Sequence, residues 1–157
     1  MKQLKLQLND VLQKLLISSG WTFDRKIDLF KDEDFLKLLD EYLFFHSARE
    51  FLESFYKICI NPSSNKTNND FVRCKVYFDP NTALGESDRL EDWEAEVNEK
   101  LFPVGEFMYF FILISESGKF FLGETDIIHY FADNVSEGLR KLISHQDELW
   151  SHITYPK

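Results

Sequence analysis

The apolar run FMYFFILI, at residues 107–114, most constrains what this chain can fold into. Eight apolar residues are too few for an independent helix, and an unbroken run of this kind is typical of a strand that is covered on both faces. Glu116-Ser-Gly-Lys119 supplies turn chemistry directly after it, and Phe120–Leu122 supplies a second apolar strand. We therefore expect a hairpin at the centre of a sheet.

The residues before this hairpin are dominated by helical periodicity. Leucines recur at helical spacing in residues 4–16, with Gly20 as the stop signal, and apolar residues recur in the same way in residues 32–45. The stretch from Ser47 to Glu50 matches a capping box and is expected to open a further helical segment. The pattern leaves open whether residues 32–56 form one kinked helix or two.

Further strands and a closing helix follow from shorter signals. Residues 58–60 favour a short strand, and residues 71–78 alternate apolar and polar side chains as a strand does. Residues 127–131 are ambiguous and are interpreted as an edge strand. Asn134-Val-Ser-Glu137 is a second capping box, which predicts the start of a final helix.

This order of elements predicts an α+β fold in a single domain spanning residues 1–157. We expect a central antiparallel or mixed sheet of about four to six strands, with helices packed mainly on one side. Sixteen Phe, six Tyr and three Trp exclude intrinsic disorder and predict an aromatic core. The polar stretch NPSSNKTNND is expected to be an exposed loop at 61–70, and residues 146–157 a short C-terminal tail.

The net charge of −9 argues against direct nucleic-acid binding, because phosphates are neutralised by a basic face. An acidic surface favours attraction to a basic partner, or it serves solubility alone, and the composition does not separate these two interpretations. No apolar run is long enough to span a membrane, so no membrane partner is expected.

Chemistry-bearing residues form no recognisable catalytic or metal motif. Cys59 and Cys74 lack metal-ligand spacing and indicate a reduced, cytoplasmic protein. Motifs for phosphate cradles and nucleophile elbows do not occur, so we expect a protein that is not an enzyme and needs no cofactor. A metal site is likewise not expected, since the histidines are scattered: His46, His129, His145 and His152.

The most charged segment lies within residues 86–101, where Leu90, Trp93, Val97 and Leu101 mark one apolar side of a helix that Pro103 is expected to end. From Glu86 to Glu99, seven acids stand against Arg89 as the one cation, a net charge of −6. Like charges at helical spacing cost roughly 0.2–0.5 kcal/mol per pair. Such a face could capture a cationic partner, or it could be an ordinary solvated helix surface. The candidate partner-binding residues are Glu86, Asp88, Glu91, Asp92, Glu94, Glu96 and Glu99.

Five stretches resemble, in order, the motifs of one known family. GWTFDRKIDL (20–29) resembles the GW-x-x-x-R-x-hydrophobic signature of the third immunity subfamily of the SUKH superfamily. AREFLESFYKICI (48–60) is similar to its FL-x-x-(F/Y) helix, and VYFDPNTAL (76–84) to its DP-x-x-A step. LFPVGEF (101–107) is similar to its L-x-PIG motif, and VSEGLRKLI (135–143) to its closing helix.

The resemblance covers roughly residues 11–145 and implies a SUKH-like fold and a binding function. It implies a bacterial, cytoplasmic immunity protein that binds a cognate toxin protein. The toxin would be the C-terminal domain of a polymorphic secreted toxin, often a nuclease or deaminase, with the immunity protein as a monomer or weak homodimer. The alternative is an intracellular protein-binding scaffold or regulator of the same fold, as in yeast cell-wall-synthesis regulators.

The resemblance also assigns a structural role to the apolar connector at 20–29. In that interpretation Trp21 and Ile27 pack under the sheet and helices, and Arg25 donates hydrogen bonds to backbone carbonyls or to a carboxylate. A partner-binding role for Arg25 is the weaker alternative. The structural motif residues are Gly20, Trp21, Arg25, Pro103 and Gly105.

Overall fold

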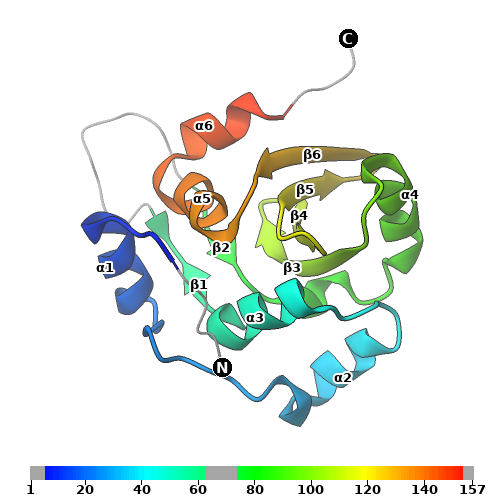
Figure 1. The fold of residues 1–157 in the computed structure, drawn as a ribbon, viewed down its shortest axis with the longest axis horizontal. Helices are drawn as coiled ribbons and strands as arrows, with labels where there is room; N and C mark the ends of the chain where they lie inside the picture. Colours follow the sequence, from blue (N-terminus) through cyan, green and yellow to red (C-terminus); the bar gives the residue numbers. More distant parts are fainter. Residues whose placement is uncertain (1–5, 63–73, 154–157) are drawn as a thin grey trace.

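A six-stranded antiparallel sheet organises the molecule, with its strands in the order β1-β2-β3-β4-β5-β6 (Figure 1). The computed structural model describes residues 6–62 and 74–153. The strands are β1 Cys59–Ile60, β2 Val76–Tyr77, β3 Leu101–Phe107, β4 Phe110–Ser115, β5 Phe120–Glu124 and β6 Ile127–Ala132. This meander confirms the predicted α+β class, the central β4–β5 hairpin and the position of β6 at the edge of the sheet.

Six α-helices surround the sheet in the described part of the chain: α1 Asp10–Ser18, α2 Glu33–Leu39, α3 His46–Phe55, α4 Ser87–Val97, α5 Val135–Leu139 and α6 Gln146–Ser151. The helical stretch at 32–56 is therefore two helices, α2 and α3, separated by residues 40–45. Short helical turns at Leu29–Lys31, Pro80–Ala83 and Arg140–Ser144 complete the fold.

The two faces of the sheet meet different helices. Successive side chains of a strand point to opposite faces. Phe110 lies 6.1 Å, between ring centroids, from Trp150 of α6, whereas its neighbour Phe111 lies 6.3 Å from Trp93 of α4. The face of Phe110 also packs against α3, since Phe120 lies 5.4 Å from Phe51. Most helices therefore cover one face, and α4 covers the other.

The apolar run at 107–114 contains a turn that its composition hides. Phe107 ends β3 and pairs with Phe110, the first residue of β4, so Met108 and Tyr109 form a two-residue connection. Met108 adopts a left-handed φ of 56°, and both side chains of the connection are exposed. The expected single strand at 107–114 was wrong, because an unbroken apolar run does not show where a tight hairpin reverses the chain.

The expected end of the acidic helix at Pro103 was also wrong. Helix α4 stops at Val97, where Asn98 takes a left-handed φ of 58° and its N–H donates to the carbonyl of Glu94. Pro103 instead lies inside β3, at an irregularity in the pairing with β4 between Pro103 and Gly105. A bulge tolerates proline in a strand because the ladder hydrogen bond is already interrupted there.

Gly105 allows β3 to pass close to the backbone that follows β2. A Cβ atom at this position would lie 2.4 Å from the carbonyl oxygen of Tyr77 and 2.9 Å from the Cα of Phe78. Both contacts are to backbone, which cannot move aside as a flexible side chain can. Any larger residue at 105 would therefore push the two strands apart.

The predicted capping box at Ser47 does not form. Helix α3 begins at His46, and the Ser47 hydroxyl donates to the carbonyl of Ser115 in β4 over 2.7 Å. The carboxylate of Glu50 lies 3.2 Å from Nε2 of His46 instead of turning back to a cap amide. The motif fails because Phe45 is the N-cap, so Ser47 lies inside the first turn and its hydroxyl donates to the sheet.

Asn134 does cap the closing helix, since its side chain accepts from the amide of Glu137 over 2.9 Å. The Glu137 carboxylate, however, pairs with Arg140 at 3.0 Å. Beyond this helix, the residues expected to be a short tail begin with α6, in which Gln146 and Leu149 are buried.

Gln146 ties α6 to the segment that precedes β2. Its Oε1 accepts from the amide of Cys74 over 2.8 Å, and its Nε2 donates to the carbonyl of the same residue over 2.9 Å. Of the strand expected at 71–78, the structure has Val76–Tyr77. The first three residues of that stretch, and most of the predicted loop at 61–70, lie outside the described residues.

The apolar connector is part of the core. Gly20 has a φ of 102°, which turns the chain out of α1 so that Trp21 can stack on Phe55 with ring centroids 5.7 Å apart. The Trp21 indole donates to Oγ of Ser54 over 2.9 Å. Arg25 donates to the carbonyl of Ser54 over 2.6 Å and to the carbonyl of Tyr56 over 2.7 Å.

These hydrogen bonds fix the connector against α3, and a segment held in the core in this way has a reason to be apolar. Arg25 satisfies carbonyls at the end of α3, which have no partner within the helix. The amide of Ile27 donates to the carbonyl of Glu53 over 2.8 Å, so the connector is held to α3 at both points. Partial burial lowers the pKa of Arg25, yet a guanidinium stays charged in proteins.

Candidate functional site

Helix α4 is held on the sheet by a narrow set of apolar contacts. Leu90 and Trp93 are its buried side chains, and Val97 is partly buried against the same core. Trp93 fits only because β5 has a glycine beneath it, since a Cβ atom at Gly123 would lie 2.6 Å from the Trp93 ring. The remaining positions of α4 are therefore free to face outwards.

Two of the seven predicted partner-binding acids are used inside the fold. The Glu94 carboxylate accepts from the amide of Leu101, at the start of β3, over 3.0 Å. The Glu99 carboxylate accepts from the amide of Ser117, in the β4–β5 turn, over 3.2 Å. Both carboxylates satisfy backbone donors, so their presence in the acidic segment has a structural cause.

Glu99 shows the electrostatic effect of this arrangement. Partial burial by itself would raise its pKa, but hydrogen bonds from Ser117 and Ser115 and the nearby charge of Lys119 together lower the pKa below its usual value. Hydrogen bonds to the charged form of a carboxylate favour that form. Glu99 therefore contributes to the fold as a charged group.

Glu86 has an internal cation partner, because its carboxylate lies 3.3 Å from Nε of Arg89. Arg89 is the one cation within residues 86–99, and its partner in this ion pair is Glu86 rather than an acid further along the helix. The four remaining acids are exposed and form no ion pair with any residue that the structure describes: Asp88, Glu91, Asp92 and Glu96.

The four exposed acids lie along one side of α4. Asp88, Asp92 and Glu96 follow one another at every fourth position, which aligns them on the helix, and Glu91 lies beside them. The rise of an α-helix separates successive members of this row by about 6 Å. The acidic row is defined as Asp88, Glu91, Asp92 and Glu96, and it presents a line of negative charge to solvent.

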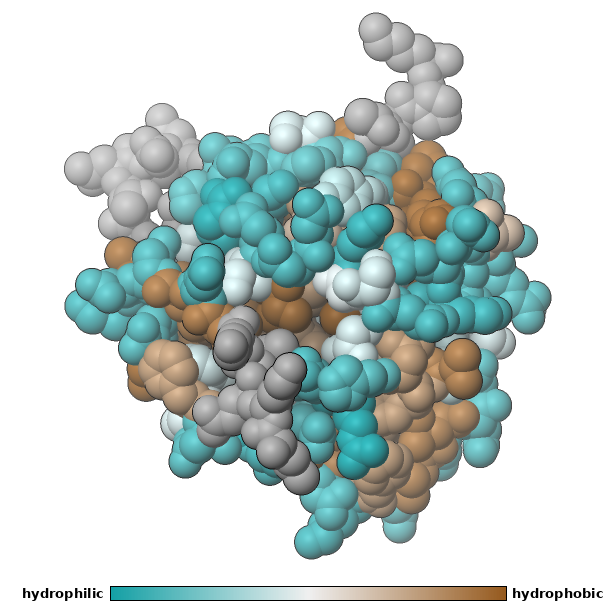
Figure 2. Space-filling view, viewed as in Figure 1, coloured by the Kyte–Doolittle hydropathy of each residue, from teal (hydrophilic) through white to brown (hydrophobic). Residues whose placement is uncertain are grey.

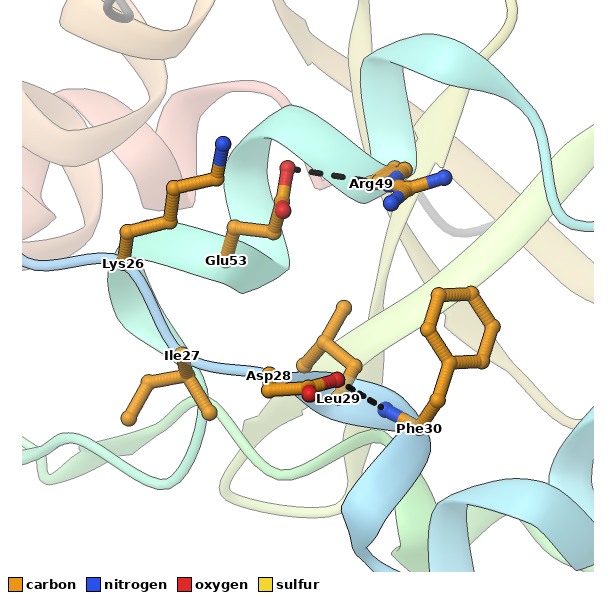
Figure 3. Close-up of a pocket in the computed structure, with 7 residues that line it drawn as sticks. All are labelled: Lys26, Ile27, Asp28, Leu29, Phe30, Arg49 and Glu53. Carbon is orange, nitrogen blue, oxygen red and sulfur yellow. Dashed lines mark hydrogen bonds and ion pairs between the residues drawn. The ribbon is translucent and has the colours of Figure 1, made fainter.

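A hollow between the connector and α3 offers a second candidate site. It has a volume of about 350 Å³ (Figure 3). Phe30 and Lys26 lie at opposite ends, with Arg49 and Glu53 between them, and the Arg49 guanidinium carbon lies 5.2 Å from the Phe30 ring centroid. Arg49 also lies 3.7 Å from the Glu53 carboxylate. The hollow is lined by two cations, Lys26 and Arg49, and by the carboxylates of Glu53 and Asp28. It therefore presents no excess of either charge.

Residues 6–62 and 74–153 contain no group of three or more His, Cys, Asp or Glu side chains that could bind a metal ion. No helix within these ranges has both the length and the apolar composition needed to cross a membrane. Cys59 and Cys74 are free thiols, and burial raises the pKa of Cys74.

Sequence reasoning placed the acidic helix but missed the residue that seats it. Gly123 is essential to the position of α4, and the one signal for it was a glycine inside an apolar strand pattern, which marks a close approach of another group. The internal roles of Glu94 and Glu99 had no signal at all, because their acceptor geometry depends on β3 and on the β4–β5 turn.

Residues 8–145 match the family model described as the SUKH-3 immunity protein. No curated protein and no solved structure matches the chain. The matched range begins before α1 and ends just before α6, so it includes the sheet, the connector and the acidic helix.

Proposed function

The chain belongs to the SUKH-3 immunity protein family, and on that premise we propose that it binds and neutralises the toxin domain of a polymorphic secreted toxin. The proposed toxin is a nuclease or deaminase that acts on nucleic acid. The complex forms in the bacterial cytoplasm, where such a toxin meets its substrate, and the immunity protein performs no reaction of its own.

The acidic row on α4 is the observation that carries this proposal. A protein that binds nucleic acid presents Lys and Arg side chains to phosphates, so its substrate channel is basic. Asp88, Asp92 and Glu96 offer such a channel a line of carboxylates with no cation partner among the described residues. The row would therefore take the place of substrate phosphates.

The proposed neutralisation combines electrostatic attraction with steric blocking of the toxin. The carboxylates steer the encounter and fix the orientation of the toxin, because electrostatic complementarity acts more on association rate than on affinity. The body of the immunity protein then blocks access of nucleic acid to the occupied channel. Trp93 and Leu90 keep the helix in place while its outer side is engaged.

The test compares two triple variants with the same net charge. Asp88→Asn/Asp92→Asn/Glu96→Gln removes three charges of the acidic row, and Asp10→Asn/Asp24→Asn/Asp147→Asn removes three exposed charges from α1, the connector and α6. The probe is the catalytically inactivated C-terminal domain of the toxin encoded beside the gene for this chain. Association rates are measured by stopped-flow over a range of NaCl concentrations.

We expect the wild-type association rate to fall steeply with salt, since exposed charges are screened beyond about 10 Å at 0.1 M. The acidic-row variant should associate about tenfold more slowly at low salt, and the control variant should resemble the wild type. Association independent of salt would remove electrostatics from the mechanism while leaving the immunity function intact.

Co-expression separates the immunity function from the scaffold alternative. Cells that express the active toxin domain should survive when they also express this chain. A chain that gives no protection and instead binds endogenous proteins would be a scaffold or regulator, and the immunity proposal would fail.

A further inference from the structure

The net charge of the chain is confined to two segments. Residues 32–41 contain five acids against Lys37, a net charge of −4, and residues 86–99 carry −6. Because the whole chain carries −9, everything outside these two segments has a net charge of +1. The first segment contains α2, and the second contains α4.

The fold brings the two acidic segments together. The carboxylate of Glu41, just after α2, accepts from the amide of Gly85, just before α4, through both oxygens at 2.9 Å and 2.8 Å. Tyr42 donates from its hydroxyl to the carbonyl of Ala83 over 2.7 Å. Burial, and then the charges of Glu41 and Glu86, raise the pKa of Tyr42.

Large apolar side chains are exposed on α2 and on the segments beside it. Figure 2 shows a continuous hydrophobic area over the region of α2, at the lower right of the view. Four large apolar side chains of α2 and the segments beside it are between 42 % and 62 % exposed. The α2 patch is defined as these four residues: Phe30, Leu36, Leu43 and Leu84.

Aromatic packing supports the patch from below. Phe44 lies under it, with its ring centroid 6.4 Å from Phe30, 5.2 Å from Phe35 and 4.9 Å from Phe102 in β3. The Phe30 side of the patch therefore rests on packed aromatic rings. An apolar centre with a polar rim is the usual anatomy of a protein–protein interface.

The charge around the patch selects the occupant. A second copy of this chain would place two net-acidic surfaces against each other, since residues 32–41 and 86–99 carry −4 and −6, and like-charge repulsion disfavours this contact. Nucleic acid and anionic membranes are repelled for the same reason. A basic protein with an apolar side chain at the centre of its contact surface fits both the patch and its rim.

We infer that the toxin domain docks on the surface formed jointly by α2 and α4. An apolar side chain of the toxin packs on the α2 patch, and surrounding Lys and Arg side chains contact the acidic row. This inference rests on the proposed function, and it adds the apolar anchor and the chemistry of the toxin surface.

The two parts of the surface have separable kinetic effects. Apolar anchors at the centre of an interface hold the complex together, so their loss raises the dissociation rate. Charges on the rim act mainly on the association rate. A patch variant and an acidic-row variant should therefore change different rate constants.

The experiment uses Leu36→Ser/Leu43→Ser as the patch variant and Val11→Ser/Ile17→Ser as the control, which removes two exposed aliphatic side chains from α1. The probe is again the inactivated toxin C-terminal domain, and binding is followed by surface plasmon resonance. Thermal melting shows that both variants are folded. We expect the patch variant to dissociate at least about tenfold faster, with little change in association rate, and the control to match the wild type.

Three other outcomes contradict the inference in different ways. If the wild type binds and the patch variant binds equally well, the α2 patch is not the docking site, although the proposed function stands. If the wild type does not bind the toxin domain, the proposed function fails and this inference fails with it. If the patch variant loses only a wild-type dimer, seen by sedimentation, the occupant is a second copy of the chain.

Discussion

The two faces of the sheet are covered in opposite ways. On one face, aromatic rings interlock: Phe51 of α3 lies 4.8 Å from Phe55, 5.1 Å from Phe78 and 5.4 Å from Phe120, between centroids. On the other face, α4 is seated mainly by Leu90 and Trp93. Helix α4 is thus fixed by its inner side alone, which leaves its outer side free to carry unpaired charge.

Truncation of the aromatic face should have the largest effect. Phe51 is fully buried among three other rings, so Phe51→Ala would leave a cavity and is expected to lower the free energy of unfolding by about 3–5 kcal/mol. Chemical denaturation followed by circular dichroism measures this loss. Phe23→Ala is the control, because Phe23 is 57 % exposed and should cost about 1 kcal/mol or less.

Loss of Arg25 tests the polar support of the same region. Arg25→Ala would leave the carbonyls of Ser54 and Tyr56 without their donor. A hydrogen bond to a charged group contributes about 1.5–3 kcal/mol net, and less where water can replace the donor, as at these part-buried carbonyls. We expect a loss of about 2 kcal/mol in the free energy of unfolding. Arg25→Lys should recover only part of this stability, because an ammonium keeps the charge but lacks the planar fork of donors.

An unchanged melting temperature together with lost toxin binding would contradict this structural role. Arg25 would then belong to the interface, and its two hydrogen bonds would be incidental to stability.

A side chain added beneath α4 should lower the free energy of unfolding less than loss of Phe51, and it should disturb α4 alone. A methyl group at Gly123 would meet the Trp93 ring at 2.6 Å, so Gly123→Ala is expected to cost about 1–3 kcal/mol. Trp93→Leu in the same chain removes the clash, so the double variant should lose less stability than the sum of the two single variants. Strict additivity of the two changes would show that the contact does not hold α4.

The smallest effect is expected at the end of the acidic segment. The pKa of Glu99 is lowered in the folded state, so its contribution is present above its unfolded pKa of about 4.3 and is lost as pH falls through the folded pKa. Glu99→Gln should therefore lower stability by less than about 1 kcal/mol at pH 7, and the difference should vanish in acid.

Asp92→Asn is the matched control, since Asp92 is exposed and belongs to the acidic row. Its effect on stability should stay within about 0.5 kcal/mol at either pH. Denaturation series at several pH values compare the two variants. Equal behaviour would show that Glu99 is an ordinary surface acid and that the division between internal and outward carboxylates is false.

The helices and the hairpin could be predicted from the sequence because their signals are local. The periodicity of Leu12, Leu15 and Leu16, for example, reports directly on the buried side of α1. Strand β3 could not be predicted in this way. Pro103 resembled a helix stop, and the bulge that accommodates it depends on the pairing with β4.

The candidate site divides in the same manner. The acidic segment could be predicted from the sequence, since charge is a property of composition. Which of its carboxylates bind inside the fold and which face solvent could not be predicted. Ser117 lies eighteen residues from Glu99, and Glu41 lies forty-four from Gly85. Contacts at such separation are set by the topology of the sheet, and so is the α2 patch beside the acidic helix.

The seating of α4 on so few side chains has an evolutionary consequence. A mutation at an inward position such as Trp93 disturbs the core, whereas Asp88, Glu91, Asp92 and Glu96 touch little else in the described structure. Substitutions at those four positions are therefore expected to leave the fold intact. The helix thus provides four positions at which substitutions can follow changes in the surface of a binding partner while the fold is kept.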